Sequence, residues 1–174
     1  ADIVRGQYRG YRAETGVAPD SRVETYVAAR LAIPNARWRG VDFTIRAGKC
    51  LAETMTDVRV RFRRPDTELF DAEIDGHPNE IRFQLSPDVS IGLKARVKKP
   101  GEAMVGEDVL LMDRRTAADQ MPPYERLLGD AMRGDRTLFG SEAGVEAAWR
   151  VVDSILTVDQ PLSGYEPGTA GPEI

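Results

Sequence analysis

Residues 41–64 read VDFTIRAGKCLAETMTDVRVRFRR, a stretch in which two strand patterns flank a short polar segment. In the first pattern, side chains alternate from Phe43 to Arg46, and the pattern stops at Ala47-Gly48. In the second pattern, every other residue is apolar and the residues between are arginines. A period of two predicts strands that have one apolar and one polar face. The apolar residues are Val58, Val60 and Phe62, and the arginines are Arg59, Arg61 and Arg63.

Similar strand patterns occur on both sides of this stretch. The segment VETYVAARLAI at residues 23–33 predicts a strand that ends at Pro34-Asn35, because proline removes a backbone donor and asparagine accepts turn geometry. Further strands are predicted in IRFQL at 81–85, VSIGLKARVKK at 89–99 and EDVLLMD at 107–113. Several of these strands therefore share an apolar face and a basic face, the latter including Lys94, Arg96 and Lys98.

Two helical patterns follow the last strand. PPYERLLGDAMRG at residues 122–134 starts with two prolines and stops at Gly134, and SEAGVEAAWRVVDSIL at 141–156 begins with Ser141 as a capping residue. Both helices carry an apolar stripe at helical spacing, which we expect to be core. The stripes are Tyr124, Leu127, Leu128, Ala131 and Met132 in the first helix, and Val145, Ala148, Trp149, Val152, Ile155 and Leu156 in the second.

Strands followed by helices predict an α+β fold, with a large, mostly antiparallel sheet and helices packed on one face. The length of 174 residues predicts a single domain, residues 1–174. Residues 1–20 show no period and predict an extended entry segment, whereas the Gly- and Pro-rich residues 164–174 predict an irregular surface tail. The basic face of the sheet should then meet water or a partner.

Charge and composition exclude several classes of protein. The first hundred residues carry a positive excess and the remainder a negative excess, but the positive excess is too small for a nucleic-acid partner. No apolar stretch approaches the length of a membrane span, so no membrane partner is expected. Cys50 is the only cysteine, which excludes an intrachain disulfide and a thiolate zinc site and suits the cytoplasm.

The residues of this chain alone do not form a complete active site. His77 is the only histidine, lies among turn residues and is expected to be an exposed loop residue. There is no Gly-x-Ser-x-Gly motif and no Gly-rich phosphate loop, and no catalytic or metal-ligating residue is predicted. Arg46 and Lys49 have two interpretations. They are either ordinary strand-end cations, or a phosphate site in which Gly48 lets a ligand approach and Lys49 supplies a point charge.

A resemblance to a known family favours the second interpretation. The stretch YRAETGVAPDSRVETYVAARLAIPNARWRGVDFTIRAGKCL resembles the start of the carboxy-terminal domain of glucose-6-phosphate dehydrogenase, notably in its Asn-x-x-Trp-x-Gly-Val turn and Arg-x-Gly-Lys run. The resemblance continues through KKPG, PPYERLLGDAMRGDRTLF, VEAAWRVVDSIL and YEPGTAGP, essentially the whole chain. By resemblance, Lys49 binds the phosphate of glucose 6-phosphate.

The resemblance also implies what this chain lacks. Members of the family oxidise glucose 6-phosphate to 6-phosphogluconolactone with NADP in the pentose phosphate pathway. They use an amino-terminal dinucleotide-binding domain and a catalytic histidine segment that do not occur here. The chain therefore resembles a truncation, and alone it is expected to be inactive and to hold no NADP tightly. The alternative function is a non-catalytic oligomerisation or sugar-phosphate-binding module derived from that enzyme.

Further expectations concern cofactor, partner and departures from the family. Family members dimerise through the sheet, which implies a homodimer through the sheet face. Eukaryotic members hold a second NADP with basic residues that match Arg46 and Arg59, but the neighbouring basic position is Met55 here, so this second site is not expected. Departures lie at Thr54, where a second basic residue is common, at Ala170, where tryptophan is common, and near Gly140, where arginine is usual.

Overall fold

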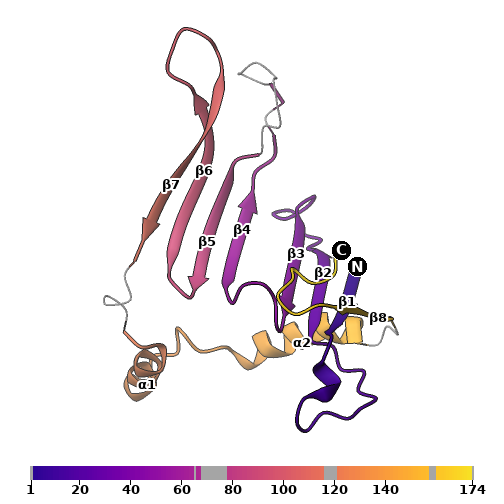
Figure 1. Ribbon diagram of the computed structural model, residues 1–174. Coiled ribbons are helices and arrows are strands. Elements are labelled where there is room, and N and C mark those ends of the chain that lie inside the picture. The colour runs from indigo at the N-terminus through magenta and orange to yellow at the C-terminus, as the bar shows by residue number, and fades with distance from the viewer. Residues whose placement is uncertain (1, 65, 68–77, 116–120, 157–159, 174) are drawn as a thin grey trace. The chain divides into compact units, whose positions relative to one another are not determined.

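The computed structural model describes residues 2–64, 66–67, 78–115, 121–156 and 160–173. The chain forms two compact units, and each is described by itself. The first unit comprises residues 1–53 and 135–174, and the second comprises residues 54–134. The prediction of a single domain stays a prediction. In chain order the elements are β1 (Asp2–Tyr8), a 3-10 turn (Tyr11–Ala13), β2 (Tyr26–Ala32), β3 (Asp42–Gly48), β4 (Thr56–Arg61), β5 (Glu80–Ser86), β6 (Ser90–Lys98), β7 (Gly106–Arg114), α1 (Pro123–Arg133), α2 (Glu142–Leu156) and β8 (Leu162–Tyr165) (Figure 1).

The first unit contains a four-stranded sheet in the order β3-β2-β1-β8. β2 pairs antiparallel with both β1 and β3, whereas β8 pairs parallel with β1, with Arg5 opposite Leu162 and Tyr8 opposite Tyr165. The expectation of an irregular tail was wrong at its start, where residues 164 and 165 belong to β8. Part of the extended entry segment forms β1. Each of the two segments finds a partner far away in the sequence that satisfies its backbone groups.

Aromatic residues form the core of this unit. Tyr26 is 2% exposed, Tyr165 is 5% exposed, and their rings lie 5.6 Å apart. Ala28 completes the buried cluster, and Val4, Tyr8 and Leu51 pack against it. The hydroxyl of Tyr26 donates to the carbonyl of Pro172 at 2.8 Å, so the tail closes over the core.

Two glycines provide the space for the Tyr26 ring. A Cβ atom added at Gly48 would lie 2.8 Å from Cδ2 of Tyr26, and one added at Gly171 would lie 2.5 Å from its Cε2. Gly171 also has a φ of 78°, which disfavours any other residue. The structure therefore gives Gly48 a packing role: its missing side chain makes room for Tyr26, which differs from the ligand-approach explanation that the sequence suggested.

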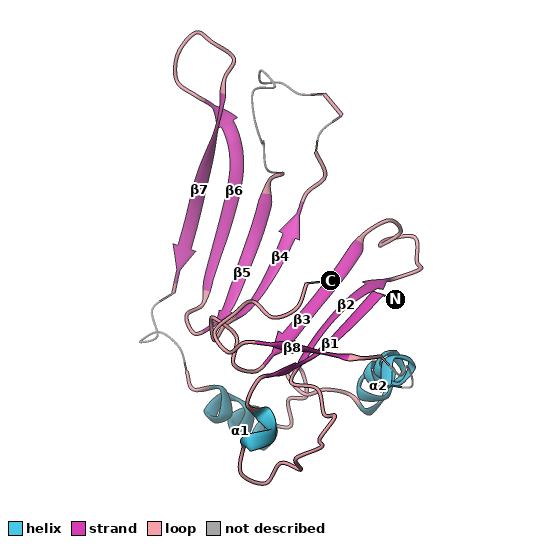
Figure 2. Cartoon of the chain, turned by 45° about the vertical axis from the view of Figure 1, so that its right-hand side comes forward, coloured by secondary structure: helices cyan, strands magenta, loops and turns pink. Residues whose placement is uncertain are grey.

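The second unit contains a four-stranded antiparallel sheet in the order β4-β5-β6-β7 (Figure 2). The predicted alternation places Val58 opposite Phe83 and Val60 opposite Ile81, so that apolar side chains share one face. Cations and carboxylates share the other face, where they form ion pairs between neighbouring strands. These pairs are Arg61–Glu80 at 3.1 Å, Arg82–Asp57 at 2.8 Å, Lys94–Asp108 at 3.0 Å and Arg96–Asp108 at 3.5 Å.

The predicted helices and their ends are confirmed. α1 begins at Pro123 and ends before Gly134, which takes the left-handed conformation at φ 72°. The hydroxyl of Ser141 accepts a hydrogen bond from the backbone of Gly144 at the start of α2. The helical stripes, however, are mostly exposed rather than core: Met132 is 90% and Trp149 is 55% exposed. Helical periodicity reveals a face that favours burial but not whether the same chain covers it.

The α+β class with mostly antiparallel sheets is confirmed. Among the described residues, the strands form two sheets rather than one, and no ladder joins β3 to β4. After β3 the backbone pairs instead with the carboxy-terminal tail, through a parallel bridge between Leu51 and Thr169. A local strand pattern cannot reveal this long-range competitor for pairing.

Replacing Gly48 with alanine should destabilise the first unit, because the buried and hydrogen-bonded Tyr26 ring cannot move away from the new methyl group. We expect Gly48→Ala to lower the free energy of unfolding by about 1–3 kcal/mol in urea titrations. Gly164→Ala is the matched control, since nothing lies within 4 Å of its added Cβ. That variant should change the free energy by less than about 1 kcal/mol. Equal effects of the two substitutions would contradict the packing role of Gly48.

Candidate functional site

Lys49 immediately follows β3 and begins a turn with unusual backbone geometry. Cys50, the next residue, has a φ of 51°, a left-handed conformation that residues other than glycine adopt infrequently. The side chains of Lys49 and Cys50 are exposed. Within the described part of the chain, the ammonium of Lys49 makes no ion pair or hydrogen bond, so it remains available to an anionic ligand.

Hydrogen bonds from two segments hold this turn in place. The amide of Lys49 donates to the carbonyl of Thr25 at 2.8 Å, which extends the pairing of β3 with β2. The tail supplies the other two bonds: the amide of Gly168 donates to the carbonyl of Cys50, and the amide of Ala52 donates to the carbonyl of Thr169, both at 2.9 Å. Backbone strain of the kind seen at Cys50 persists where surrounding contacts impose it.

A buried hydroxyl completes the attachment of the turn. The Tyr165 hydroxyl donates to the carbonyl of Lys49 at 2.7 Å, and it lies 3.1 Å from the hydroxyl oxygen of Thr25. Thr25 Oγ1 in turn accepts a hydrogen bond from the amide of Tyr8 at 2.9 Å. The Tyr165 hydroxyl also lies 3.2 Å from the carbonyl of Thr25, but its shortest contact is with the carbonyl of Lys49. Because a hydroxyl has one proton, the arrangement that uses this shortest contact has Thr25 donating to Tyr165 and Tyr165 donating to Lys49. The sequence analysis missed both Thr25 and Tyr165; the only signal was a tyrosine within an otherwise Gly- and Pro-rich tail.

Two further basic residues were candidates for cofactor binding. Arg46, on β3, directs its guanidinium to the carbonyl of Ala170 at 3.5 Å, so one of the departures from the family pattern lies next to this arginine. Arg59, on β4, donates to Asp57 at 2.8 Å, and Arg82 donates to the same oxygen at the same distance. Arg46 belongs to the first unit and Arg59 to the second, and each bonds to an atom of its own unit.

Three positions singled out in the sequence remain: Thr54, Gly140 and His77. Thr54 and Gly140 are exposed. His77 lies outside the described residues.

In the parts of the chain that the structure describes, no three His, Cys, Asp or Glu side chains gather closely enough to hold a metal ion. Neither of the described helices is long and apolar enough to cross a membrane.

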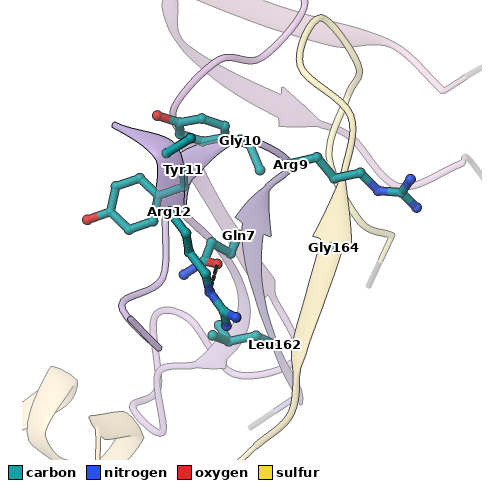
Figure 3. Close-up of a pocket in the computed structure, with 9 residues that line it drawn as sticks. Gln7, Arg9, Gly10, Tyr11, Arg12, Leu162 and Gly164 are labelled. Atoms are coloured by element: carbon teal, nitrogen blue, oxygen red, sulfur yellow. Dashed lines mark hydrogen bonds between the residues drawn. The ribbon is translucent and has the colours of Figure 1, made fainter. Parts of the chain in front are cut away.

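A shallow pocket of about 450 Å³ lies between the end of β1 and β8 (Figure 3). Its lining is formed by residues 7–13 together with Leu162 and Gly164. Several polar side chains of the pocket already have partners in this chain: Arg12 donates to the Gln7 side chain at 3.1 Å, and Arg9 pairs with Glu166, outside the lining, at 3.0 Å. Lys49 and Arg46 do not line it, so it is separate from the candidate phosphate site.

Comparison with known proteins decides the family. The glucose-6-phosphate dehydrogenase C-terminal domain matches residues 1–174, the whole chain. The chain belongs to this family. It is 38% identical to a glucose-6-phosphate 1-dehydrogenase of Aggregatibacter actinomycetemcomitans, in a match that covers 98% of this chain and 37% of that protein. A glucose-6-phosphate 1-dehydrogenase 1 of Mycobacterium bovis is also 38% identical, with 98% of this chain and 36% of that protein covered.

Solved structures agree with this assignment to the glucose-6-phosphate dehydrogenase family. The crystal structure of glucose-6-phosphate 1-dehydrogenase from Mycobacterium avium matches with a TM-score of 0.83 and 38% identity, over 98% of this chain and 37% of that one. A glucose-6-phosphate dehydrogenase in complex with its substrate glucose-6-phosphate matches with a TM-score of 0.80 and 29% identity, over 98% of this chain and 38% of that one. The chain therefore spans little more than a third of the length of these relatives.

The two arginines on Asp57 generate a prediction about pH. The hydrogen bond from Arg59, reinforced by Arg82, lowers the pKa of Asp57 below its ordinary value. A carboxylate whose pKa is lowered on folding stabilises the fold above its unfolded pKa, near 4, and this contribution disappears as pH falls through the folded pKa. Asp57→Asn should thus lower the free energy of unfolding by about 1 kcal/mol at pH 7, the scale of surface ion pairs, and by less as pH falls below about 4.

Urea titrations at pH 7 and pH 3 measure this difference. Asp113→Asn on β7 is the control, because Asp113 is exposed and no ion pair or hydrogen bond of its side chain occurs among the described residues. Its effect should stay within about 0.5 kcal/mol at both pH values. A loss for Asp57→Asn that is as large at pH 3 as at pH 7 would contradict the ionic role of Asp57.

Proposed function

We propose that this chain is the substrate-contacting and dimer-forming domain of an NADP-dependent glucose-6-phosphate 1-dehydrogenase. Membership of the family and the lengths of the relatives support this proposal, because the chain corresponds to their C-terminal domain. The solved relative described as bound to its substrate glucose-6-phosphate supports the choice of substrate. The chain contributes binding and assembly, whereas the groups that accept the proton and the hydride lie outside it.

The single observation that carries the substrate role is that Lys49 combines a fixed backbone with an exposed ammonium. Its backbone is fixed on both sides of the residue, while its ammonium is exposed and has no partner in the described residues. A lysine ammonium is a compact point charge suited to a phosphate dianion. A fixed backbone reduces the conformational freedom that must be lost when the phosphate binds. Lys49 would thus hold the phosphate end of the sugar and leave the reacting C1 end to the rest of the enzyme.

The described residues do not fit a dinucleotide site of their own. Arg59 already contacts Asp57, and Arg46 contacts the carbonyl of Ala170. We therefore assign no step of cofactor binding to this chain, and we place NADP in the full-length enzyme only.

Replacing Lys49 with glutamine should weaken substrate binding specifically. In the full-length enzyme, Lys49→Gln should raise the KM for glucose 6-phosphate by roughly 10- to 150-fold, because a charge-assisted contact contributes about 1.5–3 kcal/mol. The KM for NADP should change little. Lys49→Arg should restore only part of the affinity, since the planar guanidinium is longer than the ammonium that it replaces.

Lys99→Gln provides the matched control, because it removes the charge of another exposed lysine that lies in the other unit. Its KM values should match those of the parent enzyme. If Lys49→Gln leaves the KM for glucose 6-phosphate unchanged, or raises the KM for NADP to the same degree, Lys49 is an ordinary strand-end cation and the phosphate role fails.

The second part of the proposal is a homodimer through the polar face of the β4–β7 sheet. Four cations of this face, Arg61, Arg82, Lys94 and Arg96, already have carboxylate partners in the same sheet, so these charges would stay paired where two copies meet. The methylene stems of the arginines would supply apolar contact area. In a two-fold interface the same patch faces itself, so each substitution acts twice.

Sedimentation of the full-length enzyme should detect this dimer. Arg61→Glu should raise its dissociation constant at least about 10-fold, because the new carboxylate would face Glu80, the present partner of Arg61, in both copies. Lys99→Glu, outside the sheet, should leave the constant unchanged. A parent protein that is strictly monomeric at about 100 μM would contradict the proposal, since specific interfaces bind well below that concentration.

A further inference from the structure

We infer that Tyr165 is a positioning residue for substrate binding, whose hydroxyl fixes the backbone of Lys49 and thereby the place of its ammonium. The inference rests on the proposed function, because it assumes that Lys49 binds the phosphate. It adds a residue from the carboxy-terminal tail to the substrate site. It also assigns a purpose to a buried polar group that the core of the first unit does not need.

The first argument concerns the cost of placing a hydroxyl in the core. Tyr165 is 5% exposed and its ring lies among Tyr8 and Tyr26, where phenylalanine would fill nearly the same volume. A buried hydroxyl favours folding only when it is hydrogen-bonded. This hydroxyl is bonded, and its shortest contact, 2.7 Å, is to the carbonyl of Lys49.

The second argument concerns the direction of the hydrogen bonds. Thr25 Oγ1 accepts the amide proton of Tyr8, so its own proton is available for Tyr165. Tyr165 can then direct its single proton to Lys49. Each hydroxyl in such a chain polarises the next, which strengthens the terminal bond on the Lys49 carbonyl. The carbonyl of Lys49 is thus bonded to Tyr165 of the tail, and its amide is bonded to Thr25, the residue before β2.

The third argument concerns what the turn would do without the tail. Cys50 adopts a left-handed conformation that an isolated turn would populate only as a minor state. The tail supports this conformation at three successive points, through Tyr165 to Lys49, Gly168 to Cys50, and Thr169 to Ala52. The bond from Tyr165 is the only one of the three made by a side chain, so it can be removed by substitution without changing the backbone.

The test is a double-substitution cycle in the full-length enzyme. Tyr165→Phe should raise the KM for glucose 6-phosphate by about 3- to 10-fold, the equivalent of one net hydrogen bond, with kcat and the KM for NADP changed less than about 2-fold. In the Lys49→Gln background, the same substitution should change the KM for glucose 6-phosphate by less than about 2-fold, because the ammonium that it positions is absent. A residue that only supports the fold would raise the KM equally in both backgrounds.

Two controls separate positioning from general damage. Tyr11 is a half-buried tyrosine of the same unit whose hydroxyl makes no hydrogen bond within the described residues, so Tyr11→Phe should behave as the parent. Thr25→Val should repeat the effect of Tyr165→Phe in weaker form, because it removes the donor to Tyr165, whereas Thr25→Ser should restore parent kinetics. This second pair tests the same chain of bonds even if Tyr165→Phe impairs folding.

The outcomes distinguish this inference from the proposed function. If Lys49→Gln raises the KM but Tyr165→Phe does not, or if Tyr165→Phe raises it equally with and without Lys49, the positioning role is overturned and the phosphate role stands. If Lys49→Gln itself has no effect, the phosphate role fails, and the positioning role fails with it.

Discussion

The hydrogen bond from the buried Tyr165 hydroxyl to the Lys49 carbonyl joins the carboxy-terminal tail to the turn that follows β3. It depends on the parallel pairing of β8 with β1, which brings Tyr165 opposite Tyr8 and places its ring in the core. It also depends on Gly48 and Gly171, whose missing side chains leave room for Tyr26 beside it. The core of the first unit and the candidate phosphate site are therefore one structure.

The second unit is held together by different interactions, with no buried aromatic core among its described residues. Its sheet is held by backbone ladders and by cross-strand ion pairs on one face, while several apolar side chains of the other face, such as Val58 and Ile91, remain about half exposed. The apolar stripes of α1 and α2 are exposed in the same way. Exposed apolar area on this scale is typical of surfaces that contact further polypeptide.

Local features could be predicted from the sequence, because neighbours in the chain determine them. The strict alternation of β4, the left-handed Gly134 and the capping Ser141 are of this kind. The parallel β1–β8 pair and the division into two sheets could not be predicted, since they result from contacts between distant segments. Lys49 was proposed through resemblance to a family rather than through its spacing. Thr25 and Tyr165 were not predicted, because their hydrogen bonds join distant segments and no local pattern indicates them.

The most direct measurement is a crystal structure of the full-length enzyme with glucose 6-phosphate bound. We expect Nζ of Lys49 within about 3.2 Å of a phosphate oxygen, with Tyr165 still donating to the Lys49 carbonyl. A phosphate held by other residues, with Lys49 directed into solvent, would contradict the assignment of this turn as the substrate site.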